Sequence, residues 1–120
     1  MDIARLILRV TDMDRSVDFW SERVGLDIAF EGGLFTFLDG GCVQLALNVI
    51  DGPVDDTSLT EIVFELEDVM TAHSEMSERG VPFEVEPRTV TSDGEKDLVA
   101  AHFRDPDGHL ASITGWVKSD

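Results

Sequence analysis

The chain has 120 residues, 42% of them hydrophobic, which is typical of one folded domain with a buried core. Its 25 acidic residues face 9 basic ones, so the formal net charge is −16 at pH 7. Nucleic-acid phosphates and anionic membranes repel such a chain, which excludes both as partners. The single cysteine, Cys42, excludes an internal disulfide and a zinc knuckle of paired cysteines.

The acidic residues are spread along the whole chain, and only Lys96 and Lys118 are lysines. High ionic strength screens the repulsion among dispersed charges, whereas at low salt that repulsion destabilises a small domain. The composition therefore favours a protein of a salt-loving organism over an ordinary acidic protein. No apolar run resembles a signal peptide or a membrane span, which predicts a cytoplasmic location.

The first half of the chain predicts a strand, a helix and three more strands. Over residues 5–10 the apolar set Leu6, Leu8 and Val10 alternates with Arg5, Ile7 and Arg9, as in a strand. Asp12 suits a helix N-cap, and Gly25 suits the helix end. The apolar stripe of that helix is Met13, Val17, Trp20 and Val24. The strands that follow are predicted over residues 26–30, 34–38 and 42–48, separated by turns at 32–33 and 39–41.

The second half repeats this order of elements. Residues 61–66 predict a strand and Asp68 a helix cap, and Gly80 ends the helix. The apolar face of this helix is Val69, Ala72 and Met76. Strands are predicted over residues 82–86, 98–104 and 109–116, and the turn Asp105-Pro106-Asp107-Gly108 joins the last two.

Alignment of residues 8–31 with 64–86 supports an internal repeat. Asp12 falls on Asp68, and Ser-Glu-Arg occurs in both segments at the same place. Residues 50–59 are polar and rich in turn-forming residues, which indicates a linker. The sequence therefore predicts one domain, residues 1–120, with a first βαβββ module over about 3–49 and a second over about 60–116.

The two βαβββ units, the opening LRVTDMDRSVDFW and the turn FRDPDGH together resemble the vicinal oxygen chelate superfamily. This superfamily includes glyoxalase I, extradiol dioxygenases, fosfomycin-resistance enzymes and bleomycin-binding proteins. The resemblance covers roughly residues 3–116. It implies an α+β fold in which two tandem modules form an open, curved mixed sheet around a central pocket. It also implies a homodimer that binds a small molecule.

In that superfamily, side chains from the first and last strands of each module hold a metal ion where one is present. The matching positions here are Arg5, Gln44 (or Ala46), Glu61 and Ser112. Arginine repels a cation, and serine and glutamine are weak donors for transition metals. We therefore expect no cofactor. A relocated divalent-ion site using Glu61, His102 and Gln44 remains the alternative.

Charged residues alternate along the first strand of each module. The two caps are 56 residues apart (68 − 12), so the repeat matches Arg5 with Glu61 and Arg9 with Glu65. One hypothesis is that these pairs meet and replace the metal ion as a cross-link at the pocket floor. The alternative is that this face is hydrated and its charges are merely solvated.

His102 alternates with Ala101 and Phe103, which predicts an inward-facing side chain. There it is a candidate general base or hydrogen-bond donor to a ligand, although a position at the rim fits the pattern equally well. Trp116 either covers an end of the pocket or lies in a dimer contact. Phe35 and Phe37 share a strand face and suit either core packing or ligand stacking.

The sequence thus predicts a glyoxalase- or bleomycin-resistance-like protein that binds a small molecule without a metal ion. The predicted pocket residues are Arg5, Arg9, Gln44, Glu61, Glu65, His102 and Ser112. Whether the protein is an enzyme stays open. One alternative is a metal-dependent lyase, isomerase or dioxygenase on the relocated site. Another is a resistance protein that sequesters a cationic drug, and a third is a module whose pocket has lost its function.

Overall fold

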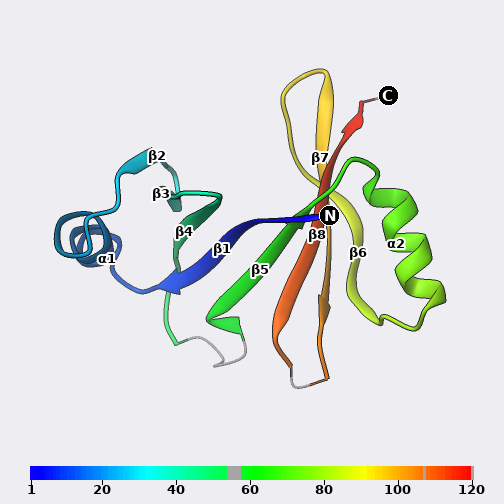
Figure 1. The fold of residues 1–120 in the computed structure, drawn as a ribbon, viewed down its shortest axis with the longest axis horizontal. Helices are drawn as coiled ribbons and strands as arrows, with labels where there is room; N and C mark the ends of the chain where they lie inside the picture. Colours follow the sequence, from blue (N-terminus) through cyan, green and yellow to red (C-terminus); the bar gives the residue numbers. More distant parts are fainter. Residues whose placement is uncertain (54–57, 107, 120) are drawn as a thin grey trace. The chain divides into compact units, whose positions relative to one another are not determined.

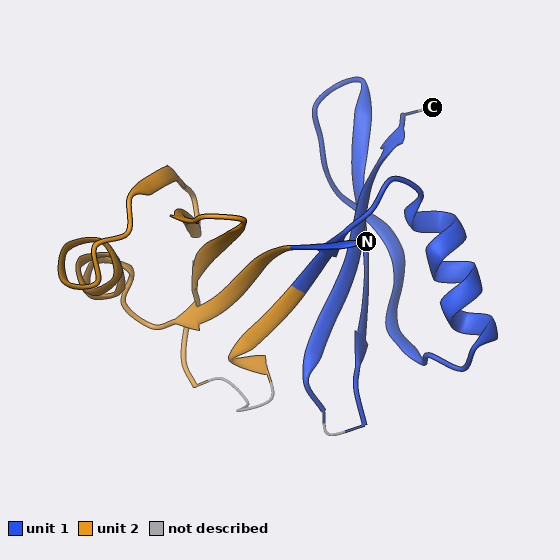
Figure 2. Ribbon diagram, in the orientation of Figure 1, with its two compact units in different colours: residues 1–3, 63–120 blue, residues 4–62 orange. Residues whose placement is uncertain are grey.

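The computed structural model describes residues 1–53, 58–106 and 108–119. Two compact units make up the chain: unit 1 comprises residues 1–3 and 63–120, and unit 2 comprises residues 4–62 (Figure 2). Residues 54–57 of the predicted linker and Asp107 of the predicted turn lie outside the described residues. In the described part of the chain, no helix combines the length and apolar character needed to cross a bilayer.

The order of elements is strand, helix and three strands, twice over (Figure 1). The first repeat contains β1 (Asp2–Val10), α1 (Met13–Val17), η1 (Asp18–Arg23), β2 (Ile28–Gly32), β3 (Phe35–Gly40) and β4 (Val43–Val49). The second contains β5 (Thr60–Glu65), α2 (Val69–Glu78), β6 (Phe83–Ser92), β7 (Lys96–Arg104) and β8 (Leu110–Lys118). The predicted α+β fold of two βαβββ modules is confirmed.

The strands are hydrogen-bonded in the order β2-β3-β4-β1-β5-β8-β7-β6. β1 runs parallel to β4, whereas β3 runs antiparallel to β2 and β4, and β7 runs antiparallel to β6 and β8. The sheet is therefore mixed and open. Residues 60–62 of β5 belong to unit 2 and residues 63–65 to unit 1, so the division between the units falls within this strand.

The first helix begins as predicted but continues differently. Asp12 is the N-cap, and its carboxylate accepts a hydrogen bond from the Arg15 N–H at 3.1 Å. After Val17 the chain continues as the π-helix η1, where the Val24 N–H donates to the Phe19 carbonyl, five residues earlier, at 2.9 Å. A π turn is wider than an α turn and breaks the 3.6-residue period. Val24, the last residue of the predicted apolar stripe, is 49% exposed.

The core of unit 1 lies between α2 and one face of the sheet. Val69 and Met76 of α2 pack with Val99 and Ala101 of β7 and Ile113 of β8. Because strand residues alternate between faces, the residues between these core positions point to the other side of the sheet. His102 and Ser112 are among them, so the core in effect fixes their orientation.

The hairpin of β6 and β7 is longer than the sequence predicts. Its strands extend to Ser92 and back from Lys96, whereas the predicted strands end at residue 86 and begin at residue 98. Residues 88–92 are exposed and mostly polar, so they lack the buried apolar alternation that identifies a strand. Asp93 closes the turn by accepting hydrogen bonds from the N–H groups of Glu95 at 2.9 Å and Lys96 at 2.7 Å.

Gly115 permits a close backbone approach between β8 and the segment that leads into α2. The Leu66 N–H donates to the Thr114 carbonyl at 3.0 Å. A Cβ atom at position 115 would lie 2.7 Å from the Leu66 carbonyl oxygen and 3.0 Å from the Val69 Cβ. A side chain there would therefore push α2 away from the sheet.

We predict that Gly115→Ala lowers the free energy of unfolding by about 2 kcal/mol, because the added methyl group overpacks a buried contact with the backbone. Urea unfolding monitored by circular dichroism measures the change. Ser74→Ala, at an exposed position of α2, is the matched control. Equal stabilities for the two variants would contradict the close approach.

The cap of α2 should make stability depend on pH. Thr71 donates its backbone N–H and its hydroxyl to the Asp68 carboxylate at 3.0 and 2.8 Å, and these bonds hold the pKa of Asp68 below its ordinary value. The stabilisation is therefore present above the pKa of the unfolded state and lost as pH falls through the folded pKa. Urea titrations should show Asp68→Ala less stable than wild type at neutral pH, with a difference that shrinks in acid. A difference independent of pH would contradict this account.

Candidate functional site

The seven predicted pocket residues are divided between the two units. Unit 2 holds Arg5, Arg9, Gln44 and Glu61, and unit 1 holds Glu65, His102 and Ser112. That all seven line one pocket remains a prediction. Within each unit, however, the structure shows which side chains lie together and what they contact.

An ion pair joins β1 to the start of β5 within unit 2. Arg9 Nη2 donates to Glu61 Oε1 at 2.8 Å, and the side chains are 20% and 4% exposed, respectively. The Arg9 backbone N–H also donates to the Leu59 carbonyl at 2.8 Å, which fixes β1 against the chain that enters β5. A carboxylate so far removed from water requires a cationic partner, and Arg9 supplies it.

The partners in this ion pair differ from those that the repeat predicts. The repeat matches Arg9 with Glu65 and Glu61 with Arg5, yet Arg9 binds Glu61. Equivalence in a repeat says which residues occupy the same place in each module. It does not say which residues meet, because that depends on the stagger between β1 and β5. The sequence predicts charge pairs between these strands, but it does not predict which arginine meets which glutamate.

Arg5 and Gln44 lie directly opposite each other on β1 and β4. In the described part of the chain Arg5 makes no ion pair, and its Nε is buried without a hydrogen-bond acceptor. These are two of the four positions that hold a metal ion in the superfamily. A guanidinium beside an amide repels a divalent cation and offers it only one weak donor.

The residues present do not fit a divalent metal ion. Of the four equivalent positions only Glu61 carries an anion, and Arg9 already binds that carboxylate. Among the described residues, no group of three or more His, Cys, Asp or Glu side chains is placed to hold a metal ion. A relocated site that uses Glu61 with His102 and Gln44 would have to compete with Arg9 for the carboxylate.

Three phenylalanines form an aromatic row in unit 2. The rings of Phe35 and Phe37 are stacked 5.9 Å apart with an interplanar angle of 8°, and Phe30 lies 6.0 Å from Phe37. Phe35 pairs with Asn48 in the strand register, and Asn48 pairs in turn with Arg9, so the row shares a sheet face with the ion pair. Phe30 is 59% exposed. The row thus provides an apolar surface that is accessible at one end.

His102 and Ser112 lie opposite each other on β7 and β8 of unit 1. Ser112 is 1% exposed and His102 is half-buried. On its other side His102 pairs with Val85 of β6. Two of the predicted residues are thus brought together on the sheet face away from α2.

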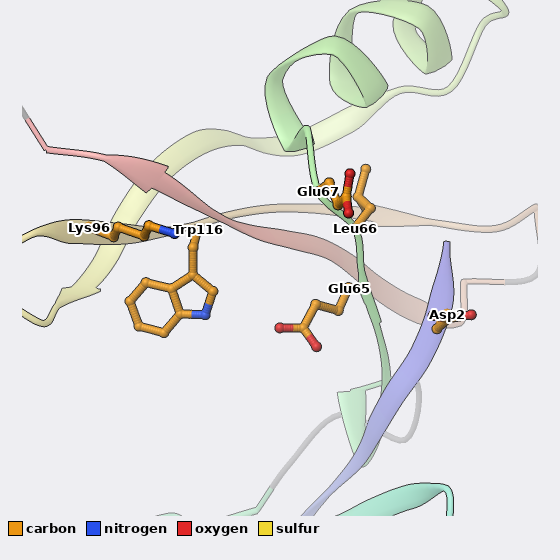
Figure 3. Close-up of a pocket in the computed structure, with 6 residues that line it drawn as sticks. All are labelled: Asp2, Glu65, Leu66, Glu67, Lys96 and Trp116. Carbon is orange, nitrogen blue, oxygen red and sulfur yellow. The ribbon is translucent and has the colours of Figure 1, made fainter.

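A pocket of about 510 Å³ lies in unit 1 near the end of β5 (Figure 3). It is lined by Asp2, Glu65, Leu66, Glu67, Lys96 and Trp116. In Figure 3 the Glu65 carboxylate extends toward the indole of Trp116. Strand alternation predicts Glu65 as a pocket residue, and aromatic character suggests Trp116 for an end of the pocket or a dimer contact. Asp2, Glu67 and Lys96 were missed, because only the strand order places them at one pocket.

Comparisons with known proteins agree with the observed fold. The chain is 27% identical to the protein YraH of Bacillus subtilis (strain 168), with 94% of this chain and 97% of the relative covered. It is 29% identical to the metallothiol transferase FosB of Lysinibacillus sphaericus (strain C3-41), with 89% and 77% covered. A crystal structure of a superfamily member from Vibrio splendidus 12B01 has a TM-score of 0.77 at 15% identity, with 97% of this chain and 98% of that chain covered.

These similarities place the fold and leave the activity open, because relatives this distant share an architecture more readily than a reaction. The match to a family model covers residues 2–113. It spans both modules and the residues equivalent to all four metal-ligand positions. The chain belongs to the glyoxalase/bleomycin resistance protein/dioxygenase superfamily.

Proposed function

We propose that this protein binds a small organic molecule at a site that uses no metal ion. The observation that carries the proposal is the ion pair of Arg9 and Glu61, in which a guanidinium binds the carboxylate that a metal ion would need. Membership of the superfamily supports small-molecule binding. The other three ligand positions hold Arg5, Gln44 and Ser112, which are poor metal ligands, and this supports the absence of a metal ion.

The ion pair also changes what the predicted pocket residues offer to a ligand. Arginine side chains favour anionic groups, but Glu61 neutralises Arg9. Glu65 has no ion-pair partner in the part of the chain that the structure describes, so its charge is available to a ligand. The aromatic row of unit 2 offers a surface for stacking.

Two alternatives rest on relatives. The similarity to the metallothiol transferase FosB favours a metal-dependent enzyme, which here requires the relocated site of Glu61, His102 and Gln44. The superfamily also includes bleomycin resistance proteins, which favours a protein that sequesters a drug. A metal-dependent enzyme requires tight, specific binding of a divalent ion, whereas a sequestering protein does not.

The proposal places the protein as a homodimer in the cytoplasm of a salt-loving organism. The net charge of −16 supports the last part, because dispersed acid is tolerated at high ionic strength. The superfamily resemblance supports the homodimer. Sedimentation equilibrium in molar salt measures the mass of the assembly directly.

Divalent ions should leave the thermal unfolding midpoint of the chelator-treated protein unchanged in molar potassium chloride. The ions to test are nickel, zinc, manganese and iron(II), with calcium as the control for non-specific binding to surface carboxylates. An ion that binds only the folded state adds about 2.7 kcal/mol of stability at a hundredfold excess over its dissociation constant. A saturable rise with one transition metal and not with calcium, if the variant Glu61→Gln abolishes it, would overturn the metal-free proposal.

Glu61→Gln identifies the origin of any such rise. A stabilisation that this variant abolishes places the ion at Glu61. The favoured function would then be that of a metal-dependent enzyme. A stabilisation that survives arises elsewhere on the acidic surface and leaves the proposal standing.

Arg9→Met should lower the free energy of unfolding by about 3 kcal/mol, because it leaves the buried Glu61 carboxylate without compensation. The double variant Arg9→Met/Glu61→Gln should lose less than the sum of the single variants, with a coupling of about 2 kcal/mol. Urea unfolding in molar salt measures all four proteins of the cycle.

Arg5→Met is the matched control, on the same strand and face. Arg5 makes no ion pair with a described residue, so this variant should change stability by less than about 1 kcal/mol. Equal losses for Arg5→Met and Arg9→Met, or additive losses in the cycle, would contradict the assigned role of the ion pair.

A further inference from the structure

The pocket at the end of β5 combines an open space with an unusual wall. Its volume of about 510 Å³ suits a small organic molecule. Trp116 of β8 forms one wall, and its indole is 40% exposed. Within the described part of the chain no other aromatic ring stacks on this indole. A large apolar ring that faces a cavity offers stacking area that the folded chain leaves unused.

The charges around this indole are unbalanced. Asp2, Glu65 and Glu67 supply three carboxylates, and Lys96 supplies one ammonium group, which gives a local charge of −2 (1 − 3). None of these four side chains forms an ion pair with another described residue. The carboxylates are thus not consumed within the protein, in contrast to Glu61.

The position of Glu65 links charge and ring. It is the last residue of β5, and in Figure 3 its carboxylate extends toward the Trp116 indole. Lys96 and Trp116 lie two strand positions apart in the register of β7 and β8, on one face of the sheet, because Leu98 is opposite Trp116. A ring stacked on the indole would therefore lie between an anion and a flanking cation.

We propose that this pocket binds a planar organic monocation, that is, a flat ring system with one fixed positive charge. The ring stacks on Trp116, where cation–π attraction adds to the apolar contact. The Glu65 carboxylate neutralises the charge, and Asp2 and Glu67 add attraction at longer range. This inference rests on the proposed function only in taking the protein to bind small molecules, and it does not depend on whether a metal ion binds.

The side chains that line the pocket should also distinguish ligands by their charge. An anion of the same shape meets three carboxylates and is repelled. The dispersed acidic surface would attract any cation. A preference for a planar monocation must therefore come from the side chains that line this pocket.

Equilibrium dialysis in molar potassium chloride with 10-methylacridinium tests the proposal. Acridine-9-carboxylate, of similar size and shape, is the anionic comparison. We expect the cation to bind at least about tenfold more tightly and to quench the fluorescence of Trp116, because stacking and charge act together. The chain has only 2 tryptophans, so Trp20→Phe isolates that signal.

Two variants assign the binding to the named side chains. Glu65→Gln should weaken 10-methylacridinium binding about fivefold or more, whereas Glu22→Gln, an equal charge change at an exposed position of η1, should leave it unchanged. Trp116→Leu should weaken binding about tenfold or more, and Trp116→Phe should retain part of it. Circular dichroism of each variant establishes that it is folded.

Equal binding of the two acridines would indicate stacking without recognition of charge, and equal effects of Glu65→Gln and Glu22→Gln would indicate only general attraction to an acidic surface. Either result would overturn the proposal. Absence of cation binding by the folded protein would overturn it as well, while the metal-free proposal would stand on its own thermal-unfolding result. Conversely, specific binding of a transition metal would overturn the proposed function and leave the cation pocket intact.

Discussion

The contact between Arg9 and Glu61 determines much of what this protein can do. A carboxylate that is 4% exposed must be compensated, and the Arg9 guanidinium does so in this chain. The chain has the guanidinium, and it also has a cation at Arg5, where a neutral ligand would be needed for a metal ion. Losing either partner leaves a buried charge, so the two residues constrain each other. In the proposed metal-free function, ligand binding depends on stacking and on charges that the protein leaves unpaired.

The sequence predicted those parts of the fold that local interactions determine. Asp12 and Asp68 cap the helices as expected, because a side chain and an N–H three residues away need nothing from the rest of the chain. The π-helix η1 was not predicted, since apolar spacing assumes a regular period of 3.6 residues. The extension of the β6–β7 hairpin was missed because its outer residues are exposed on both faces.

The candidate site was predictable to the extent that it follows strand alternation. Alternation correctly grouped Arg5 with Arg9, and it placed His102 on the sheet face that α2 does not cover. It could not identify the partner of Arg9, because the stagger of neighbouring strands is a property of the whole sheet. For the same reason, strand alternation does not predict that Asp2 and Lys96 border the pocket of Trp116.

The most direct test of the account is a crystal structure of the protein grown with a transition metal, with diffraction recorded at the absorption edge of that metal. We expect Arg9 Nη2 to lie within hydrogen-bonding distance of Glu61 Oε1, with no anomalous peak beside that carboxylate. An anomalous peak at Glu61, with Arg9 turned away from it, would contradict the claim that the ion pair takes the place of the metal ion.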